Sequence, residues 1–530
     1  MPSESLAFTN SPATPALSPG RRRLVLAAVC LSLVLVVAGT TMLNVALPDL
    51  ARSLHASQSQ QQWIVDAFSV ALAALLLPAG VLGDRYGRRT TLLAGIGLFA
   101  LTAALAAVTT SAATLIVLRV LSGAGAALIM PGTLSTITSV FPAEERANAV
   151  AVWSGFAGGG AVIGLVGSGA MLEQFWWGSI FAVTAVLAVV AAVATVAIVP
   201  PTRDPAAPKV HVPGSVLSIL AIGGLVLGIT EGPERGWSNP LTLLGLIGGA
   251  VALAAFVWSS LRAEHPLFDP RLFRNRGFSA GTVSVFLQFL AMMGFFFIFL
   301  QYLQLVQGYG TFKAAVAVVP LAVAMMPAST AAARLATRFG GRYVGAAGLA
   351  LSALGFLWLA QLTVTSSYVP VLIGMVVTGV GLGLGMTPAT NAIVESLPVA
   401  NQGLASAVND TSREMGGAFG IAIVGSAFTA GYRSHVASGL RNLPAPVAAA
   451  AKQAPAAAIQ VASRLGTDGH ALVHTARTAF LSGQRDALLI GAATLMVGVA
   501  FVLLRGASPV PQVETDLAWE DGGLELELAG

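Results

Sequence analysis

The stretch "GVLGDRYGRRTTL", residues Gly80–Leu92, separates two of the most apolar parts of this 530-residue chain. Four of its thirteen residues are charged, although only 10% of the residues in the whole chain are. Gly80 and Gly87 permit a close helix approach and a tight turn, because glycine has no side chain. The arginines alone would be typical of a loop that orients the chain in a membrane. Orientation does not explain Asp84 between two glycines, so we expect this turn to make a specific contact.

The composition places the chain in a membrane. Hydrophobic residues make up 55% of the sequence, and the mean hydropathy is +0.80. A soluble globular protein has about a quarter of its residues charged. The apolar residues form blocks of about twenty, the length that spans a bilayer as a helix. The sequence therefore predicts an all-α polytopic membrane protein with fourteen spans, at roughly 24–47, 62–82, 91–110, 114–141, 148–171, 177–199, 215–230, 240–261, 278–306, 313–333, 343–362, 368–394, 403–431 and 484–505.

The distribution of basic residues predicts the orientation. The short loops on one side hold most of the arginines, and those on the other side hold only Arg52, Arg235 and Lys313. The positive-inside rule therefore predicts that both termini are cytoplasmic. The formal net charge of +5 does not indicate nucleic-acid binding, because the basic residues do not form one patch along the sequence.

The spans divide into two groups of six with two helices inserted between them. We expect bundles at 24–199 and 278–505, an inserted pair at 215–261, and disordered cytoplasmic ends at 1–23 and 506–530, the latter acidic. Residues 432–483 are expected to form a long outer loop with room for a short helical hairpin. A repeat supports two related halves: in "AARLATRFGGR", residues 332–342, Leu335, Arg338, Gly340 and Arg342 correspond to Leu82, Arg85, Gly87 and Arg89.

The opening stretch resembles the signature loop of the major facilitator superfamily. "LIVLRVLSGAGAA", residues 115–127, resembles the fourth-helix motif of its exporters, and "GGGAVIGLVGSG", residues 158–169, resembles their antiporter motif. With fourteen spans, the chain looks like the drug:proton antiporter branch. The resemblance implies a conformational latch formed by Gly80, Gly83, Asp84, Arg85, Gly87, Arg88 and Arg89, and an antiporter motif at Gly160, Gly164 and Gly167. The chain departs from the branch at Gly39, often Asp, and at Leu165, usually Pro.

Ionisable residues within spans are costly and mark candidate functional sites. Asp66 lies about 27 Å along the helix from Asp84, in the outer part of the second span. We expect it to bind a proton or a substrate cation; the alternative is a carboxylate that is hydrated or paired with Arg52. Arg119 in the fourth span is expected to influence a nearby carboxyl group; the alternative is a structural donor to backbone carbonyls.

A second acidic group lies in the thirteenth span. Asp410 and Glu414 are four residues apart and therefore share a helix face, and Arg413 is close enough to pair with Asp410. We expect a proton-coupling carboxylate pair with an internal counter-ion; the alternative is a structural salt bridge. In the ninth span Gln288, Met292 and Tyr302 are candidate substrate contacts, with packing or lipid contact as the alternative.

The sequence contains no GxxxxGK[ST] motif, no Cys/His metal cluster and no nucleophile–base set. We therefore expect neither an ATP-driven pump nor an enzyme, and no cofactor, metal or obligate protein partner. The expected function is proton-coupled export of hydrophobic or amphiphilic toxic compounds across the cytoplasmic membrane by alternating access. The alternatives are a dedicated exporter of one endogenous product, such as an antibiotic, and a non-transporting sensor or scaffold on the same fold.

Overall fold

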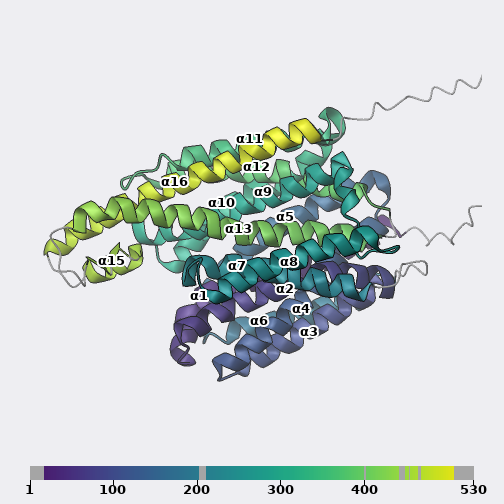
Figure 1. Ribbon diagram of the computed structural model, residues 1–530, viewed down its shortest axis with the longest axis horizontal. Helices are drawn as coiled ribbons and strands as arrows, with labels where there is room; N and C mark the ends of the chain where they lie inside the picture. Colours follow the sequence, from purple (N-terminus) through teal and green to yellow (C-terminus); the bar gives the residue numbers. More distant parts are fainter. Residues whose placement is uncertain are drawn as a thin grey trace, which may run out of the picture.

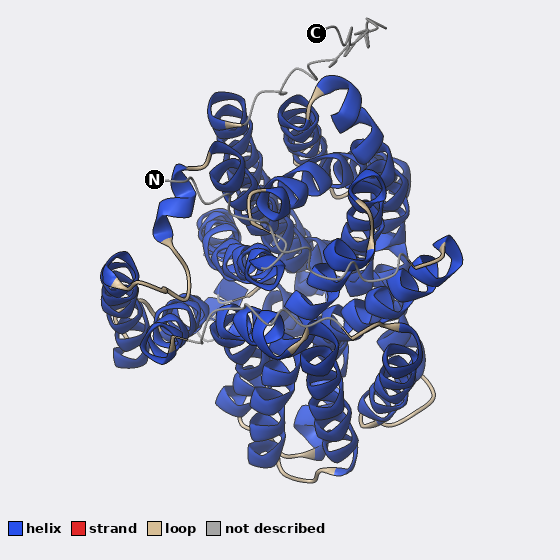
Figure 2. Ribbon diagram, turned by 90° about the vertical axis from the view of Figure 1, so that its right-hand side faces the viewer, coloured by secondary structure: helices blue, strands red, loops and turns tan. Residues whose placement is uncertain are grey.

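The computed structural model describes residues 17–201, 211–398, 401–440, 448–449, 451–452, 454–462 and 467–506. Within these ranges the chain forms helices and no strand (Figure 2). Fourteen of the helices are long and apolar enough to cross a membrane. The predicted all-α fold with fourteen spans is therefore confirmed.

The helices follow one another with short connections. The first six are α1 (Pro19–Ser53), α2 (Gln58–Tyr86), α3 (Arg88–Val108), α4 (Ala112–Val140), α5 (Ala143–Leu172) and α6 (Ser179–Ile198). Two more, α7 (Val212–Arg235) and α8 (Pro240–Arg262), lead through the 3-10 helix η1 (Pro270–Arg274) to the remaining ones. These are α9 (Arg276–Gln301) with its π-helical end η2 (Tyr302–Val306), α10 (Thr311–Phe339), α11 (Gly341–Leu359), α12 (Tyr368–Glu395), α13 (Gln402–Val436), the 3-10 helix η4 (Ala437–Leu440), α15 (Pro455–Ala462) and α16 (Thr467–Arg505).

Two boundaries differ from the expected ones. The first helix begins at Pro19, because the Ser18 side chain accepts a hydrogen bond from the backbone of Arg21 at 3.4 Å and so caps it. At the other end of the chain, α13 continues to Val436 and α16 begins at Thr467, so helices occupy much of the stretch expected as an outer loop. Most of the expected disordered ends, 1–16 and 507–530, lie outside the described residues.

The extended ends of α13 and α16 have an apolar core of their own. Tyr432, Val436, Leu440, Ala458 and Leu472 are buried in it. The Tyr432 hydroxyl also donates a hydrogen bond to the backbone carbonyl of Ala451 at 2.8 Å. These helices, with α15, project at the left of Figure 1. The charged residues of this segment suggested a loop, but the alanine and leucine spacing on α16 is helical and buries one face.

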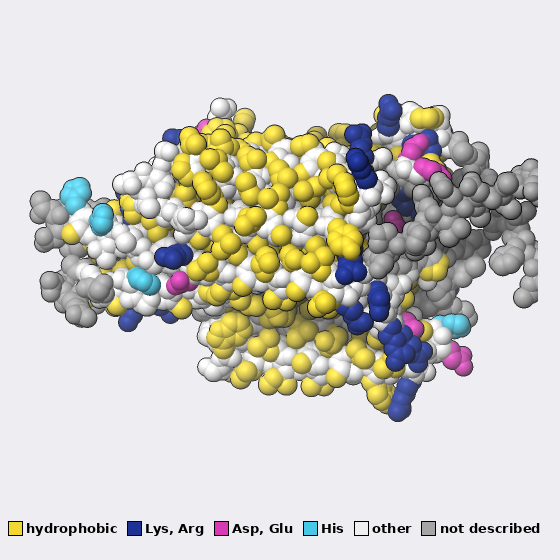
Figure 3. All heavy atoms as spheres, turned by 90° about the horizontal axis from the view of Figure 1, so that it is seen from above, with side chains coloured by type: hydrophobic (Ala, Val, Ile, Leu, Met, Phe, Trp, Pro, Cys, Tyr) yellow, Lys and Arg dark blue, Asp and Glu magenta, His cyan; other side chains and the backbone are white. Residues whose placement is uncertain are grey.

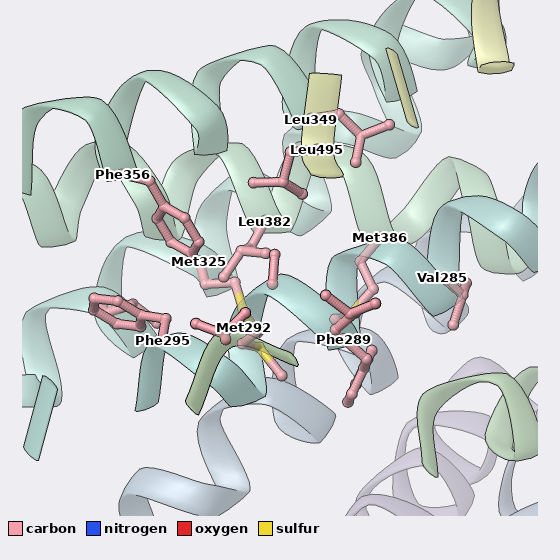
Figure 4. Packing of buried hydrophobic residues seen from close by; sticks show 14 of the residues in the cluster. Val285, Phe289, Met292, Phe295, Met325, Leu349, Phe356, Leu382, Met386 and Leu495 are labelled. Carbon is pink, nitrogen blue, oxygen red and sulfur yellow. The ribbon is translucent and has the colours of Figure 1, made fainter. Parts of the chain in front are cut away.

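In Figure 1 α1–α4 and α6 lie together below α9–α13 and α16, whereas α5, which packs against α1, is drawn among the second group beside α10, which it also contacts. The largest cluster of buried apolar residues belongs to the second group (Figure 4) and reaches the first through Ala73, Leu77 and Val162. The helices α7 and α8 form a tight hairpin, and α7 contacts α2 and α13, one from each group. The inserted pair is therefore packed beside the boundary between the two groups.

The surface shows how the bundle is suited to a bilayer. Figure 3 shows a broad band of hydrophobic side chains, with Lys and Arg gathered at the right-hand end. This end, called the basic end below, carries the turns at Gly87 and Gly340 and the last residues of α16. It is the end where α2 ends and α13 begins, so the residues of the opening stretch lie there.

Candidate functional site

Asp84 lies near the end of α2 and binds the amino end of α13. The backbone N–H groups of Gly403 and Leu404 donate to its Oδ1 and Oδ2 atoms at 2.9 and 3.1 Å. The first turn of α13 contains no acidic residue, and its N-cap Asn401 makes no side-chain capping bond. A helix amino end has unsatisfied N–H groups and favours negative charge. Asp84, only 6% exposed, therefore caps a helix that belongs to the other group.

Two glycines allow this contact by letting α2 and α13 cross closely. A Cβ atom added at Gly80 would lie 2.4 Å from the carbonyl oxygen of Gly403, and one added at Gly403 would lie 2.4 Å from that of Gly80. Both contacts involve backbone atoms, which cannot move aside without separating the helices. At Gly83 a Cβ would meet nothing within 4 Å. Gly80 and Gly403 are therefore the pair that the crossing requires.

The arginines of the opening stretch fix the turn within the first group. Gly87 has φ of 100°, a conformation that glycine adopts readily. Arg88 lies 3.5 Å from Asp84 and donates to the carbonyl of Ser135 on α4 at 3.2 Å. Arg89 donates to the carbonyl of Val196 on α6 at 2.8 Å, and Arg85 lies over the ring of Tyr86. The turn is thus tied to α4 and α6 while Asp84 reaches α13.

The first intramembrane charge centre joins α4 to α1 and α2. Arg119, 4% exposed, donates to the backbone carbonyls of Ile64 at 2.9 Å and Gly39 at 3.4 Å. Its guanidinium lies over the Phe68 ring, 4.3 Å from the centroid, and interacts electrostatically with the half-buried Asp66. Arg119 is thus a structural donor to backbone carbonyls and, at the same time, the cation beside Asp66.

The second centre lies where α13 meets α5 and α9. Asp410 is fully buried, and its Oδ1 accepts from Asn409 at 3.2 Å. The Arg413 guanidinium lies 4.6 Å from the Trp153 ring centroid on α5 and 5.2 Å from that of Phe289 on α9. Among the described residues, Asp410 Oδ2 and Arg413 Nε and Nη2 have no hydrogen-bond partner.

Arg413 and Asp410 attract each other electrostatically, as their spacing suggested, but they form no direct ion pair in this conformation. The ion pairs found in the described part of the chain, within 4.0 Å, do not include either residue. Spacing on a helix brings the two side chains to one face, and the aromatic rings of two neighbouring helices hold the guanidinium beyond ion-pair distance of the carboxylate. Glu414 is half-buried on the next turn and interacts electrostatically with both.

The three glycines of the proposed antiporter motif on α5 differ in how closely a neighbouring helix approaches them. A Cβ at Gly164 would lie 2.7 Å from Ala38 Cα, and one at Gly160 would lie 3.2 Å from Val37 Cβ, so both bring α5 against α1. Thr41 of α1 also donates to the carbonyl of Ala161 at 3.0 Å. At Gly167 a Cβ would meet nothing within 4 Å.

The candidate substrate contacts of α9 are occupied by protein in this conformation. Gln288 is 1% exposed, and its amide donates to the Ser284 hydroxyl at 3.0 Å. Met292 lies in the apolar cluster among side chains from neighbouring helices (Figure 4). Tyr302 is fully buried at the π-helical end, where its hydroxyl accepts from Gln307 at 2.6 Å. The structure thus has all three in packing positions.

Sequence reasoning missed three residues that the structure places at these centres, and one buried acid on α7. Trp153 and Phe289 hold Arg413, and Gly403 faces Gly80. Glu231 is 2% exposed and pairs with Arg235 on α7, one residue beyond the predicted seventh span. The sequence does not show which residue an aromatic side chain or a glycine in an apolar span will contact. Glu231, in contrast, could have been singled out, because an acidic residue at the edge of a span is unusual.

The comparisons with known proteins agree on one family. The model of the "Major Facilitator Superfamily" matches residues 29–421. The multidrug efflux pump LfrA of Mycolicibacterium smegmatis is 35% identical over 490 residues, which cover 91% of this chain and 97% of that protein. The tetracenomycin C resistance and export protein of Streptomyces glaucescens is 30% identical over 501 residues, covering 92% and 93%. The crystal structure of the human organic anion transporter MFSD10 superposes with a TM-score of 0.61 at 13% identity, covering 92% of this chain and all of that one.

Proposed function

This chain belongs to the Major Facilitator Superfamily, and from that premise we propose that it exports hydrophobic or amphiphilic toxic compounds in exchange for protons, by alternating access. Its relatives include a multidrug efflux pump and an antibiotic export protein, which supports export as the direction of transport. We place it in the cytoplasmic membrane of a bacterium, with both termini in the cytoplasm and the basic end on that side.

The contact of Asp84 with α13 is the observation that carries the proposal of alternating access. It joins the first six-helix bundle to the second at the basic end through two charge-assisted hydrogen bonds. Opening that end requires these bonds to break, so the contact is a latch for the conformation that is closed toward the cytoplasm. Gly80 and Gly403 provide the close approach, and the turn at Gly87 with Arg85, Arg88 and Arg89 holds Asp84 in place.

The buried acids support proton coupling. A carboxylate is expensive to bury without partners, and a bound proton removes its charge. Asp410 meets this condition, because it is fully buried and its Oδ2 has no partner among the described residues. Asp66 beside Arg119 and Glu414 beside Arg413 are the further proposed sites for a proton or a substrate cation.

Movement of the two bundles would change the surroundings of the remaining candidates. Gln288, Met292 and Tyr302 are proposed to contact substrate only when the packing around α9 opens, since they are buried in the present conformation. Gly160, Gly164 and Gly167 of the proposed antiporter motif lie on α5, which contacts α10 of the other bundle.

The experiment is uptake into inverted membrane vesicles. A fluorescent amphiphilic cation should accumulate when a proton gradient is imposed without ATP, and the accumulation should collapse with a protonophore. The Asp410→Asn variant, with normal abundance in the membrane, should accumulate the dye but lose its dependence on the gradient, or lose transport. Uptake that survives the protonophore in the presence of ATP would overturn proton coupling.

A second candidate is export of one endogenous product, and the tetracenomycin C export relative favours it. The two candidates differ in substrate range rather than in mechanism. A panel of dyes and toxic cations would be exported in the first case, whereas only one chemical class would be exported in the second.

A further inference from the structure

A basic pocket lies at the end of α16, away from the latch and the intramembrane acids. It is an open depression of about 390 Å³, lined by Leu261, Pro270, Arg271, Phe273, Arg274 and Arg505. Two parts of the chain form it: the last turn of α8 with η1, and the last residue of α16. These segments are more than two hundred residues apart in the sequence, so the pocket is a product of the fold.

Three arginines line this pocket, and none of the described residues in its lining is acidic. Arg271 is held in place, because one of its guanidinium N–H groups donates to the carbonyl of Leu261 at 3.3 Å. Asp269, which directly precedes η1, is already used: its carboxylate accepts from the backbone N–H of Arg271 at 2.9 Å and caps η1. Three like charges around one space favour an anion there, and arginine matches the geometry of a phosphate group.

The position of the pocket indicates which kind of anion it meets. The membrane spans of α8 and α16 end at Arg262 and Arg505, so the arginines lie at the depth of the lipid headgroups. Apolar side chains face outward beside them: Leu504 is 80% exposed, Trp258 is 59% exposed, and Phe273 is 41% exposed. A ligand with a phosphate at one end and hydrocarbon at the other fits both features.

We propose that this pocket binds the phosphodiester headgroup of an anionic phospholipid. Arg271, Arg274 and Arg505 contact the phosphate, and the acyl chains lie along the exposed apolar side chains of α8 and α16. The bound lipid would connect η1, which leads from the inserted helices to the second bundle, with the last helix of that bundle. The site does not depend on proton coupling or on which substrate is exported.

The experiment measures lipid binding to the purified full chain by native mass spectrometry. Phosphatidylglycerol is the probe, phosphatidylethanolamine is the zwitterionic control, and inorganic phosphate tests for a soluble anion. The double variant Arg274→Gln/Arg505→Gln should bind phosphatidylglycerol about thirtyfold more weakly, since each cation near the surface contributes roughly fivefold. The matched double variant Arg23→Gln/Arg334→Gln removes the same charge from exposed positions at the same end and should bind like the wild type.

A charge-conserving variant separates binding from folding. Arg274→Lys/Arg505→Lys should retain most of the binding, and all variants should elute as the wild type does in size-exclusion chromatography. Equal binding of phosphatidylglycerol by wild type and the Gln double variant would overturn the proposal. Equal occupancy by inorganic phosphate at the same concentration would overturn the assignment to a lipid. Absence of dye transport by the wild type, with its lipid binding intact, would count against the proposed function only.

Discussion

The turn between α2 and α3 and the turn between α10 and α11 have nearly the same backbone. Gly87 has φ 100° and ψ 131°, and Gly340 has φ 87° and ψ 136°. Each glycine N–H donates to the carbonyl four residues earlier, at 3.1 and 2.9 Å. Both positions require glycine, because a side chain is strained at these φ values. The two halves of the protein therefore share the same connection between their second and third helices.

The arginines that follow the two glycines also make equivalent contacts. Arg89 donates to the carbonyl of Val196 near the end of α6, and Arg342 donates to that of Leu503 near the end of α16. Each ties the turn to the last helix of its own bundle. The residues that the two stretches share thus build the turn and fix it within one half.

The residues that differ are those that reach the other half. Gly80 and Asp84 contact α13. Their counterparts are Ala333, which is buried, and Thr337, which is exposed and donates to the carbonyl of Arg334 in its own helix, so Thr337 does not reproduce the contact of Asp84. The helices α13 and α5, which α2 and α10 contact across the boundary between the two halves, also differ in the charge of their first turns. The first turn of α5 contains Glu144 and Glu145, whereas that of α13 contains no acid and takes Asp84 instead. The shared glycines and arginines of the repeat therefore have a structural role within each half, whereas Gly80 and Asp84 make the contact between the bundles.

Removing the charge of Asp84 should have the largest effect. Asp84→Asn keeps the size but weakens the bonds to the α13 amides by about 1–3 kcal/mol, which shifts a two-state population roughly five- to 150-fold. We expect normal abundance, retained substrate binding and severely reduced transport in vesicles. Thr337→Ala, the corresponding change in the second half, should transport normally. Wild-type rates in Asp84→Asn would show that the stretch only orients the chain.

Giving the first half the residue of the second should have the next largest effect. In Gly80→Ala the new Cβ would lie 2.4 Å from the Gly403 carbonyl oxygen and 2.6 Å from Ala407 Cβ, so α2 and α13 must separate. We expect the contact between α2 and α13 to be destabilised by about 1–3 kcal/mol, and transport to be partly lost. Gly97→Ala on α3, where a Cβ meets nothing within 4 Å, is the matched control. Full transport by Gly80→Ala would mean that the close crossing is not needed.

Removing the two shared arginines should have smaller and similar effects. Arg89→Gln and Arg342→Gln each remove a charged donor from a backbone carbonyl at a partly exposed site, which should cost about 1 kcal/mol of stability. The midpoint of thermal unfolding in detergent should fall by a comparable amount in both. A large loss in one variant alone would contradict the equivalence of the two turns.

Adding the missing acid to the second half should have the smallest effect. Thr337→Asp places a carboxylate on an exposed face of α10, beside a bundle whose α5 already has two acids in its first turn. We expect transport and thermal stability close to those of the wild type, within about 0.5 kcal/mol, as for most surface substitutions. A marked slowing of transport would show that the second turn also meets the other half.

The fold was predictable from the sequence, because apolar blocks of membrane length and loop arginines act locally. The role of Asp84 as a specific contact was also predictable, since a lone acid between glycines is unfavourable without a partner. The partner of Asp84 was not predictable, because Gly403 is more than three hundred residues away and binds through its backbone rather than through a side chain. For Arg413 the i,i+3 spacing indicated Asp410, with which it does interact electrostatically, but the spacing gave no sign of Trp153 and Phe289, the rings from other helices that hold the guanidinium.

The projection formed by α13, α15 and α16 has a practical consequence for imaging. At 1.5 Å per residue, the 35-residue α13 and the 39-residue α16 are about 52 and 58 Å long, well beyond the roughly 30 Å of a hydrocarbon core. Because Tyr432, Val436 and Leu472 pack in its core, the projection should stand as an ordered feature outside a detergent micelle. Averaged particle images could then be aligned on it, and an antibody fragment raised against it would mark the end of the molecule opposite the basic end.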